Sequence, residues 1–176
     1  MKKSIRAVLM ALLVTACQDQ QAQTTGPTPP VPSDGVTASV TVDNLNAQVG
    51  QTVRVRAEVQ VGTSQTYRVG SYTGRLRFDP ARLEFAGENR INDGLRVANA
   101  QGAASGEIRF AGASPTGFET LVLYDASFVV RSPAYTQNLR LAMEELSAAT
   151  TLANLAPQLR VNNQVFLHRA APAPRP

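Results

Sequence analysis

The sequence has few of the side chains that most often carry enzyme chemistry. It contains one histidine, His168, and its two lysines, Lys2 and Lys3, lie at the N-terminus. The globular part therefore lacks a lysine nucleophile or Schiff base. His168 lies at the end of the last expected strand, where we expect a surface residue rather than a general base. We predict no catalytic residues, no cofactor and no enzyme activity.

Tryptophan is absent, which removes the side chain most typical of flat carbohydrate-binding surfaces. Tyr67, Tyr72 and Tyr135 lie in or beside expected loops and are the remaining candidates to stack on a sugar. One hypothesis for the function is therefore that the loops around Tyr67 and Tyr72 bind a polysaccharide; it is the alternative to the binding of a protein partner.

Clustered metal ligands are also scarce. Asp43, Asn44 and Asn46 offer oxygen atoms within one loop, but their spacing is not that of a helix-loop-helix calcium site. Asp and Asn are ordinary turn residues, so we expect a turn here and predict no metal site. Glu144 and Glu145 are neighbours in an expected strand and should point to opposite faces, too divergent for an acid-base pair.

Cysteine occurs once, at Cys17, so no internal disulfide can form and the fold depends on its apolar core. The residue follows a positively charged start and an apolar run, residues 7–14, that is too short to span a bilayer. Val14-Thr15-Ala16-Cys17 resembles the bacterial lipobox, in which an aliphatic residue and two small residues precede the cysteine that is lipidated. We predict a lipoprotein signal peptide over 1–16 and lipidation of Cys17. An ordinary signal peptide with an incidental cysteine is the alternative.

Proline-rich polar sequence after Cys17 has almost nothing to bury. We predict a flexible tether over 17–35, which holds the domain off a lipid surface, and a disordered tail over 170–176. Gln18 stands where an aspartate would favour retention in the inner membrane, so we expect a lipid-anchored protein of the cell envelope, at the outer membrane.

Positive charge is concentrated in the predicted signal peptide. The precursor has 17 basic and 13 acidic residues. Removal of Lys2, Lys3 and Arg6 leaves a formal net charge of about +1, which is too little for a broad nucleic-acid-binding surface. We predict no nucleic-acid partner.

Alternating apolar residues dominate the rest of the chain. Val53, Val55, Ala57, Val59 and Val61 alternate with polar residues, a period of two that is typical of half-buried strands. The same period returns around 38–42, 76–78, 108–110, 124–130 and 139–143. A final strand is expected around 159–167, where apolar residues fall on both parities and Asn162-Asn163 indicates a bulge. We predict an all-β protein, an antiparallel two-sheet sandwich over 36–169, with 146–155 as a loop. The predicted core residues are Val55, Val59, Leu76, Phe78, Ile108, Phe110, Phe128, Val130 and Leu141.

One strand of this pattern stops abruptly in the stretch 75–85, RLRFDPARLEF. Asp79 can cap a short turn with its carboxylate, and Pro80 lacks the N–H that a continuing strand needs. We therefore expect a sharp turn, after which Leu83 and Phe85 return to the core.

This stretch and its neighbours resemble the cohesin domains. In that family an aromatic-Asp-Pro step ends a core strand and a leucine and an acidic residue follow, as in Phe78-Asp79-Pro80 and Leu83-Glu84. Matching short motifs are the Val-rich strand 53–61, the Gly-x-Ile strand from Gly106, the strand 124–130, Leu139-Arg140-Leu141 and the closing strand 161–165. The departures are Gln164, where the closing motif usually has glycine, a segment 65–72 that is longer than expected, and the lack of a dockerin-like duplicated calcium loop. The resemblance implies a jelly-roll-type sandwich and a binding role, either to a protein or, as in carbohydrate-binding relatives, to a glycan.

Arginines occupy outward positions of several expected strands: Arg54, Arg56, Arg75, Arg77, Arg109 and Arg140. In the cohesin resemblance partners dock on one face of the sandwich. We predict that Arg54, Arg56, Arg75 and Arg77 lie on such a face and pair with carboxylates of a partner. The alternative is a solvated face interleaved with Glu58, Glu107 and Glu144.

Overall fold

The computed structural model describes residues 26–27 and 34–168. The predictions for the signal peptide, for Cys17 and for the C-terminal tail, as well as most of the tether, concern residues outside these ranges. No helix within the described ranges is long and apolar enough to cross a membrane.

Nine strands and two short 3-10 turns make up the described chain. In chain order they are β1 (Val36–Val42), β2 (Thr52–Val61), β3 (Val69–Arg77), β4 (Leu83–Glu88), β5 (Leu95–Asn99), η1 (Gln101–Ser105), β6 (Glu107–Ala113), β7 (Val122–Val130), β8 (Arg140–Ala148), η2 (Ala156–Gln158) and β9 (Leu159–Leu167).

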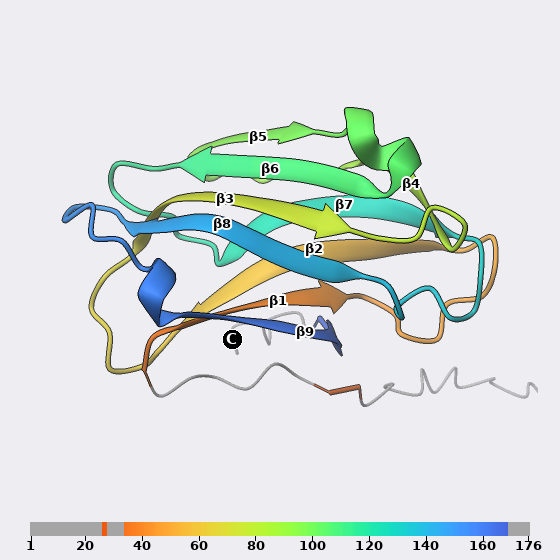
Figure 1. Cartoon of the computed structure of the whole chain (residues 1–176), viewed down its shortest axis with the longest axis horizontal. Helices are drawn as coiled ribbons and strands as arrows, with labels where there is room; N and C mark the ends of the chain where they lie inside the picture. Colours follow the sequence, from red (N-terminus) through yellow and green to blue (C-terminus); the bar gives the residue numbers. More distant parts are fainter. Residues whose placement is uncertain (1–25, 28–33, 169–176) are drawn as a thin grey trace, which may run out of the picture.

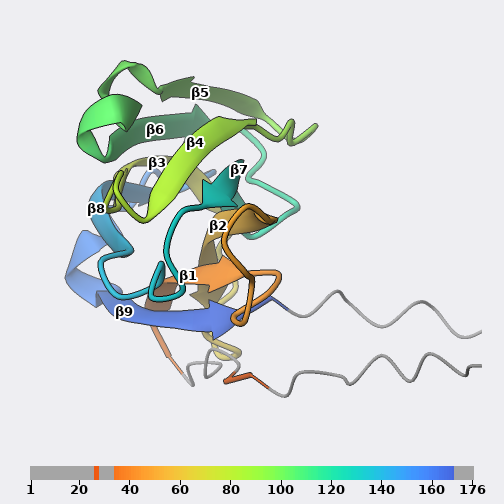
Figure 2. The same ribbon diagram turned by 90° about the vertical axis from the view of Figure 1, so that its right-hand side faces the viewer.

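The strands form two packed sheets, which confirms the predicted all-β sandwich. One sheet has five strands in the order β4-β7-β2-β1-β9 and the other has four in the order β5-β6-β3-β8. Figure 1 shows β5, β6, β3 and β8 side by side in front of β7 and β2, and Figure 2 shows the two layers edge-on. Among the paired strands described, β9 alone runs parallel to its neighbour, β1. The chain crosses between the sheets at almost every connection, so residues distant in sequence share a face.

The predicted core is confirmed. All nine of its residues are at most 6% exposed, and β2 shows why, since Val53, Val55, Ala57 and Val59 are buried while its arginines point outward. Phe78 packs edge-on against Phe128 with ring centroids 5.0 Å apart. Burial of the inward face of each strand is the main stabilising force, because the described part has no disulfide.

Asp79 and Pro80 form the crossing from the four-stranded to the five-stranded sheet. The Asp79 carboxylate accepts a hydrogen bond from the backbone N–H of Ala81 at 2.9 Å, and the Asp79 carbonyl accepts those of Arg82 and Leu83. Gly106 packs against this turn with φ of 82°, and a Cβ there would lie 2.2 Å from the Phe78 carbonyl oxygen. Leu83 then enters the core, as predicted, with 0% exposure.

Two parts of the chain differ from the sequence prediction. Strand β8 continues through Leu146 to Ala148, where a loop was expected, because these residues pair with β3 and bury Leu146 at 1% exposure. Strand β5 was not predicted at all, since its alternation spans only a few residues. The bulge at Asn162-Asn163 is confirmed, with a register shift of β9 against β1 opposite Ser39 and Val40.

Candidate functional site

The outer surface of the four-stranded sheet combines a charged half and an apolar half. We call it the four-stranded face. Strand pairing arranges its side chains in rows, with Leu95, Ala113 and Ser71 in one row, Val97, Ala111 and Thr73 in the next, and Asn99, Arg109 and Arg75 in the third. The last row contains Glu107, Arg77 and Arg140.

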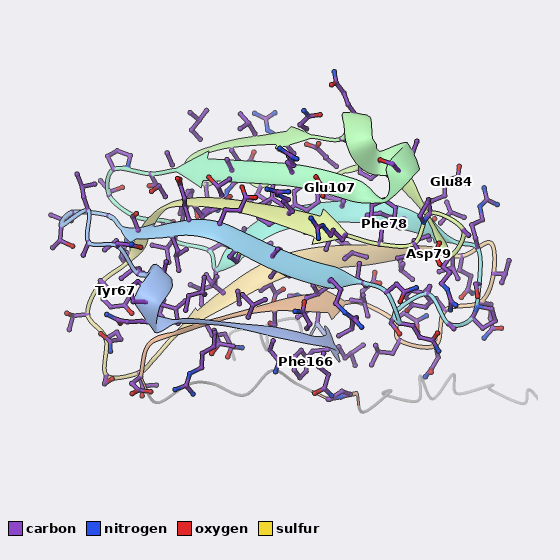
Figure 3. All side chains as sticks on the ribbon, viewed as in Figure 1. Tyr67, Phe78, Asp79, Glu84, Glu107 and Phe166 are labelled. Carbon is purple, nitrogen blue, oxygen red and sulfur yellow. The ribbon has the colours of Figure 1, made fainter. Side chains whose placement is uncertain are left out.

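Glu107 organises the charged half. Its carboxylate accepts hydrogen bonds from Arg109 Nε at 2.9 Å and from Arg77 Nε at 3.1 Å, and Arg75 lies 4.0 Å away. Figure 3 shows Glu107 over the sheet between β3 and β6. The hydrogen bonds from Arg109 and Arg77 lower the pKa of Glu107, because they favour its ionised form.

Two arginines of this cluster remain largely available to a partner. The side chains of Arg77 and Arg109 are 58% and 61% exposed, although each gives its Nε to Glu107. Arg75 is more enclosed and also pairs with Glu144 of β8. Part of the predicted solvated alternative is therefore present, with Glu107 and Glu144 between the arginines, but the outer guanidinium nitrogens still face solvent.

The apolar half lies beside these charges on the same face. Leu95 and Val97 are 69% and 61% exposed, unusual values for large aliphatic side chains. They line a shallow groove of about 260 Å³ together with Ala111, Ala113 and Thr73. Exposed apolar surface that is bordered by charged residues is typical of protein-interaction surfaces. This apolar half of the face was not predicted from the sequence, because Leu95 and Val97 form only a very short alternation with their polar neighbours.

Arg96, between Leu95 and Val97, holds β5 in position. Its guanidinium points inward and donates to the Tyr72 hydroxyl and the Val122 carbonyl, both at 2.7 Å. It also lies 4.4 Å from the centre of the Phe118 ring and pairs with Asp93. Because Arg96 faces the interior, its two neighbours must face solvent.

The four predicted arginines do not share a face, which corrects the sequence prediction. Arg54 and Arg56 belong to β2 in the five-stranded sheet, whereas Arg75 and Arg77 belong to β3 in the other. A turn of the chain between β2 and β3 moves it from one sheet to the other, and this cannot be inferred from strand parity. The four arginines therefore form two separate clusters, Arg54 with Arg56 on the five-stranded sheet and Arg75 with Arg77 on the four-stranded sheet.

Arg54 and Arg56 are occupied within the protein. Their Nε atoms donate to the two carboxylate oxygens of Asp125, at 2.7 and 2.9 Å, and Asn89 donates to the same carboxylate at 2.8 Å. Asp125 is only 3% exposed. The hydrogen bond to Asp125 raises the pKa of Arg54. Because both arginines already pair with a buried carboxylate of the same chain, we assign this cluster a structural role and not a role in binding a partner.

The predicted stacking tyrosines are also corrected. Tyr72 lies in β3, is 2% exposed and donates its hydroxyl hydrogen to the Leu123 carbonyl, so it cannot stack on a ligand. Tyr135 is 1% exposed because its ring is part of the core, so it too cannot stack on a ligand. Tyr67 is half-buried, its hydroxyl contacts Gln158, and desolvation raises its pKa. In Figure 3, Tyr67 and Asp79 lie at opposite ends of the sandwich.

Comparison with known proteins gives the architecture a name. No protein-family profile and no curated protein matches this chain. Solved structures do match it. A type I cohesin in a cohesin-dockerin complex from Clostridium thermocellum superposes with a TM-score of 0.54 at 12% identity, covering 80% of this chain and 97% of that one. The domain has the cohesin fold.

Other structures with this cohesin fold match equally well. The sixth cohesin of scaffoldin B from Acetivibrio cellulolyticus, in complex with a dockerin, has a TM-score of 0.54 at 14% identity and covers 75% of this chain and 99% of that one. The seventh type I cohesin of ScaB from Pseudobacteroides cellulosolvens has a TM-score of 0.52 at 15% identity, with coverages of 80% and 97%. The resemblance that the Asp79-Pro80 turn suggested is thus confirmed at the level of the fold.

Within the cohesin fold, the remaining polar candidates have structural roles. Asp43 accepts the Arg54 N–H, and Asn44 accepts that of Asn46, as expected of turn residues. No group of three or more metal-ligating side chains occurs among the residues described. Glu144 and Glu145 both face outward, contrary to prediction, because a bulge opposite Thr73 and Gly74 inserts one residue.

His168 is less exposed than expected. Its Nδ1 lies 2.7 Å from Glu58 Oε1, and its side chain is 25% exposed. Thr41 donates a hydrogen bond to the same Glu58 oxygen at 2.9 Å. Because the histidine contacts the carboxylate and not the hydroxyl, the arrangement differs from that of an activated nucleophile. It ties the end of β9 to β2.

Proposed function

We propose that this protein is a non-catalytic lipoprotein of the cell envelope whose cohesin-like domain binds a protein partner at the cell surface through the four-stranded face. The observation that carries the proposal is the placement of Leu95 and Val97, both more than 60% exposed, on the same sheet face as the exposed Arg77 and Arg109, with Val97 in the row next to that of Arg109. Interfaces typically combine a desolvated apolar centre with a charged rim. Several solved proteins of the same fold are described as cohesins in complex with dockerins, which supports a protein as the partner.

The chemistry of the face defines the partner. Leu95 and Val97 fit an apolar side chain that inserts between β5 and β3, over Ala111. The free guanidinium nitrogens of Arg77 and Arg109 fit carboxylates next to that anchor. Exposed ion pairs contribute at most about 1 kcal/mol each, so the apolar contact must provide most of the affinity. We therefore expect an acidic segment with an exposed aliphatic or aromatic side chain.

Attachment to the membrane is the second part of the proposal. Lipidation of Cys17 after cleavage of residues 1–16, followed by a proline-rich spacer, would display the domain from the outer membrane. Several acyl chains hold a protein stably, whereas one does not. The test is Cys17→Ser with cell fractionation. The variant should leave the membrane fraction, and unchanged membrane association would contradict the lipid anchor.

Binding is tested with two variants of the four-stranded face and one matched control. Leu95→Ser with Val97→Ser removes the apolar anchor, and Arg77→Ser with Arg109→Ser removes the exposed charge. Arg68→Ser with Arg160→Ser makes the same change of charge at exposed sites in the loop before β3 and in β9. The partner is first captured from the envelope of the same organism, then purified and titrated at low and high salt.

The expected pattern distinguishes the contributions. Loss of the apolar anchor should weaken binding by about 2 kcal/mol or more, which is about thirtyfold. Loss of Arg77 and Arg109 should weaken binding less and should reduce its salt dependence, while the control leaves both unchanged. Equal binding by all variants would place the interface elsewhere. Binding to a glycan array with no protein partner would favour the polysaccharide alternative.

A further inference from the structure

Another cavity lies at the side of the sandwich where β4, an edge strand of the five-stranded sheet, connects to β5, an edge strand of the four-stranded sheet. It has a volume of about 400 Å³ and is lined by the β4–β5 connection, by β5 and by the start of β7. This volume is within the range of small-ligand sites. We call it the inter-sheet cleft. It requires neither of the arginine pairs discussed above.

Tyr124 lies inside this cleft with an unused hydroxyl. The residue is 5% exposed, and its ring stacks on Phe110 with centroids 5.2 Å apart and planes 9° apart. Its hydroxyl oxygen is buried and has no hydrogen-bond partner within the described part of the chain. Burial, followed by the charges of Glu88 and Asp125, raises the pKa of Tyr124, so the hydroxyl remains a donor. Buried hydroxyls are normally paired, so an unpaired one in the lining of a cavity is a candidate to bond a group that enters it.

Glu88, Arg90 and Asn92 supply polar groups at the exposed rim of the cleft. Among the described residues, these three side chains have no hydrogen-bond or ion-pair partner. Glu88 is a hydrogen-bond acceptor and Arg90 a donor, whereas Asn92 and the Tyr124 hydroxyl can each donate and accept. Ile91 and Leu123 add apolar surface between them.

The charges of the cleft cancel, which selects the class of ligand. The charged side chains that line the cleft are two of each sign, Glu88 and Asp125 against Arg90 and Arg96. Arg96 pairs with Asp93, and Asp125 pairs with Arg54 and Arg56, which lie outside the lining. Among the described lining residues, the unpaired charges are therefore Glu88 and Arg90, of opposite sign. A strongly charged ligand would therefore leave one of them unpaired, whereas a neutral ligand with several hydroxyls can bond both.

We propose that the inter-sheet cleft is a binding site for a neutral saccharide, in which the Tyr124 hydroxyl bonds a sugar hydroxyl at the floor and Glu88 and Arg90 bond others at the rim. Ile91 and Leu123 contact the C–H surfaces of the ring. This site is distinct from the tyrosine loops predicted from the sequence, and it does not depend on the protein-binding role of the four-stranded face.

The test is an NMR titration of the labelled full-length chain. Cellobiose, maltose and chitobiose serve as neutral probes, N-acetylarginine amide as a cationic probe and acetate as an anionic probe, each to about 10 mM, enough to detect a millimolar site. A neutral disaccharide should shift the backbone signals of residues 88–92 and 123–125. Tyr124→Phe should weaken its binding about tenfold, whereas Tyr67→Phe, which removes a hydroxyl at η2, should not.

Stability provides the second measurement. Since the Tyr124 hydroxyl has no partner among the described residues, Tyr124→Phe should leave the urea midpoint unchanged or raise it, while it weakens saccharide binding. The proposal is overturned if none of the disaccharides shifts the cleft signals, if only a charged probe does so, or if Tyr124→Phe binds a shifting disaccharide as tightly as the unmodified chain. A lowered urea midpoint would also overturn it, because the hydroxyl would then be paired within the protein.

Discussion

Asp125 is the residue at which the electrostatics of this fold can be measured most directly. It accepts hydrogen bonds from Arg54, Arg56 and Asn89, and its side chain is 4% exposed. The two arginines differ, since the side chain of Arg56 is 11% exposed and that of Arg54 is 43% exposed. Asp125→Ala therefore leaves one cation enclosed by protein and one that can turn into water.

The size of the effect follows from that difference. Removal of one partner from a buried ion pair costs about 3–5 kcal/mol, because the other charge remains desolvated, whereas an exposed pair contributes at most about 1 kcal/mol. We expect Asp125→Ala to lower the free energy of unfolding by about 3 kcal/mol, and Arg54→Ala to lower it by less than about 1 kcal/mol. Arg56→Met combined with Asp125→Leu should recover part of the loss, because neither charge is then left unpaired.

Urea denaturation followed by far-ultraviolet circular dichroism measures these changes. With a slope of about 1.5 kcal/mol per molar urea, the loss for Asp125→Ala corresponds to a shift of about 2 M in the midpoint. Tyrosine fluorescence serves as the second probe, since the chain has no tryptophan. A shift below about 0.5 M for Asp125→Ala, or a shift for Arg54→Ala as large as that for Asp125→Ala, would refute the reasoning.

Three further outcomes follow from burial and charge. Phe78→Ala should lower the free energy of unfolding by about 3–5 kcal/mol through lost burial and the cavity left behind, and a urea-midpoint change equivalent to less than about 1 kcal/mol would contradict its core position. Burial and the charge of Asp43 raise the pKa of Tyr135 to about 12, above its value in the unfolded chain, so stability should fall as pH rises above 10, in step with phenolate absorbance. Glu107, whose folded pKa is lowered, should show a rise in carboxyl pKa by NMR when Arg77 and Arg109 are both replaced by Ser, and no rise would mean that these pairs do not form in solution.

The sequence alone determined which residues form the core and where one strand must end. Strict alternation in β2 separates its valines from its arginines, and a pleated strand allows only that arrangement once one face is buried. Asp79 and Pro80 determine the turn after β3 through local chemistry, a carboxylate that caps and a missing N–H. These features depend on neighbouring residues, so they can be predicted without knowledge of the rest of the chain.

Only the tertiary structure decided which residues share a surface. Arg56 and Arg75 both point outward from their strands, yet they lie on different sheets, because the order of strands in a sheet depends on long-range pairing. The same pairing buries Tyr72, places Val97 in the row next to that of Arg109 on the four-stranded face, and places Tyr124 within the inter-sheet cleft. Parity gives the direction of a side chain relative to its own strand, and a binding site requires the relative positions of several strands, which the packing of the two sheets sets.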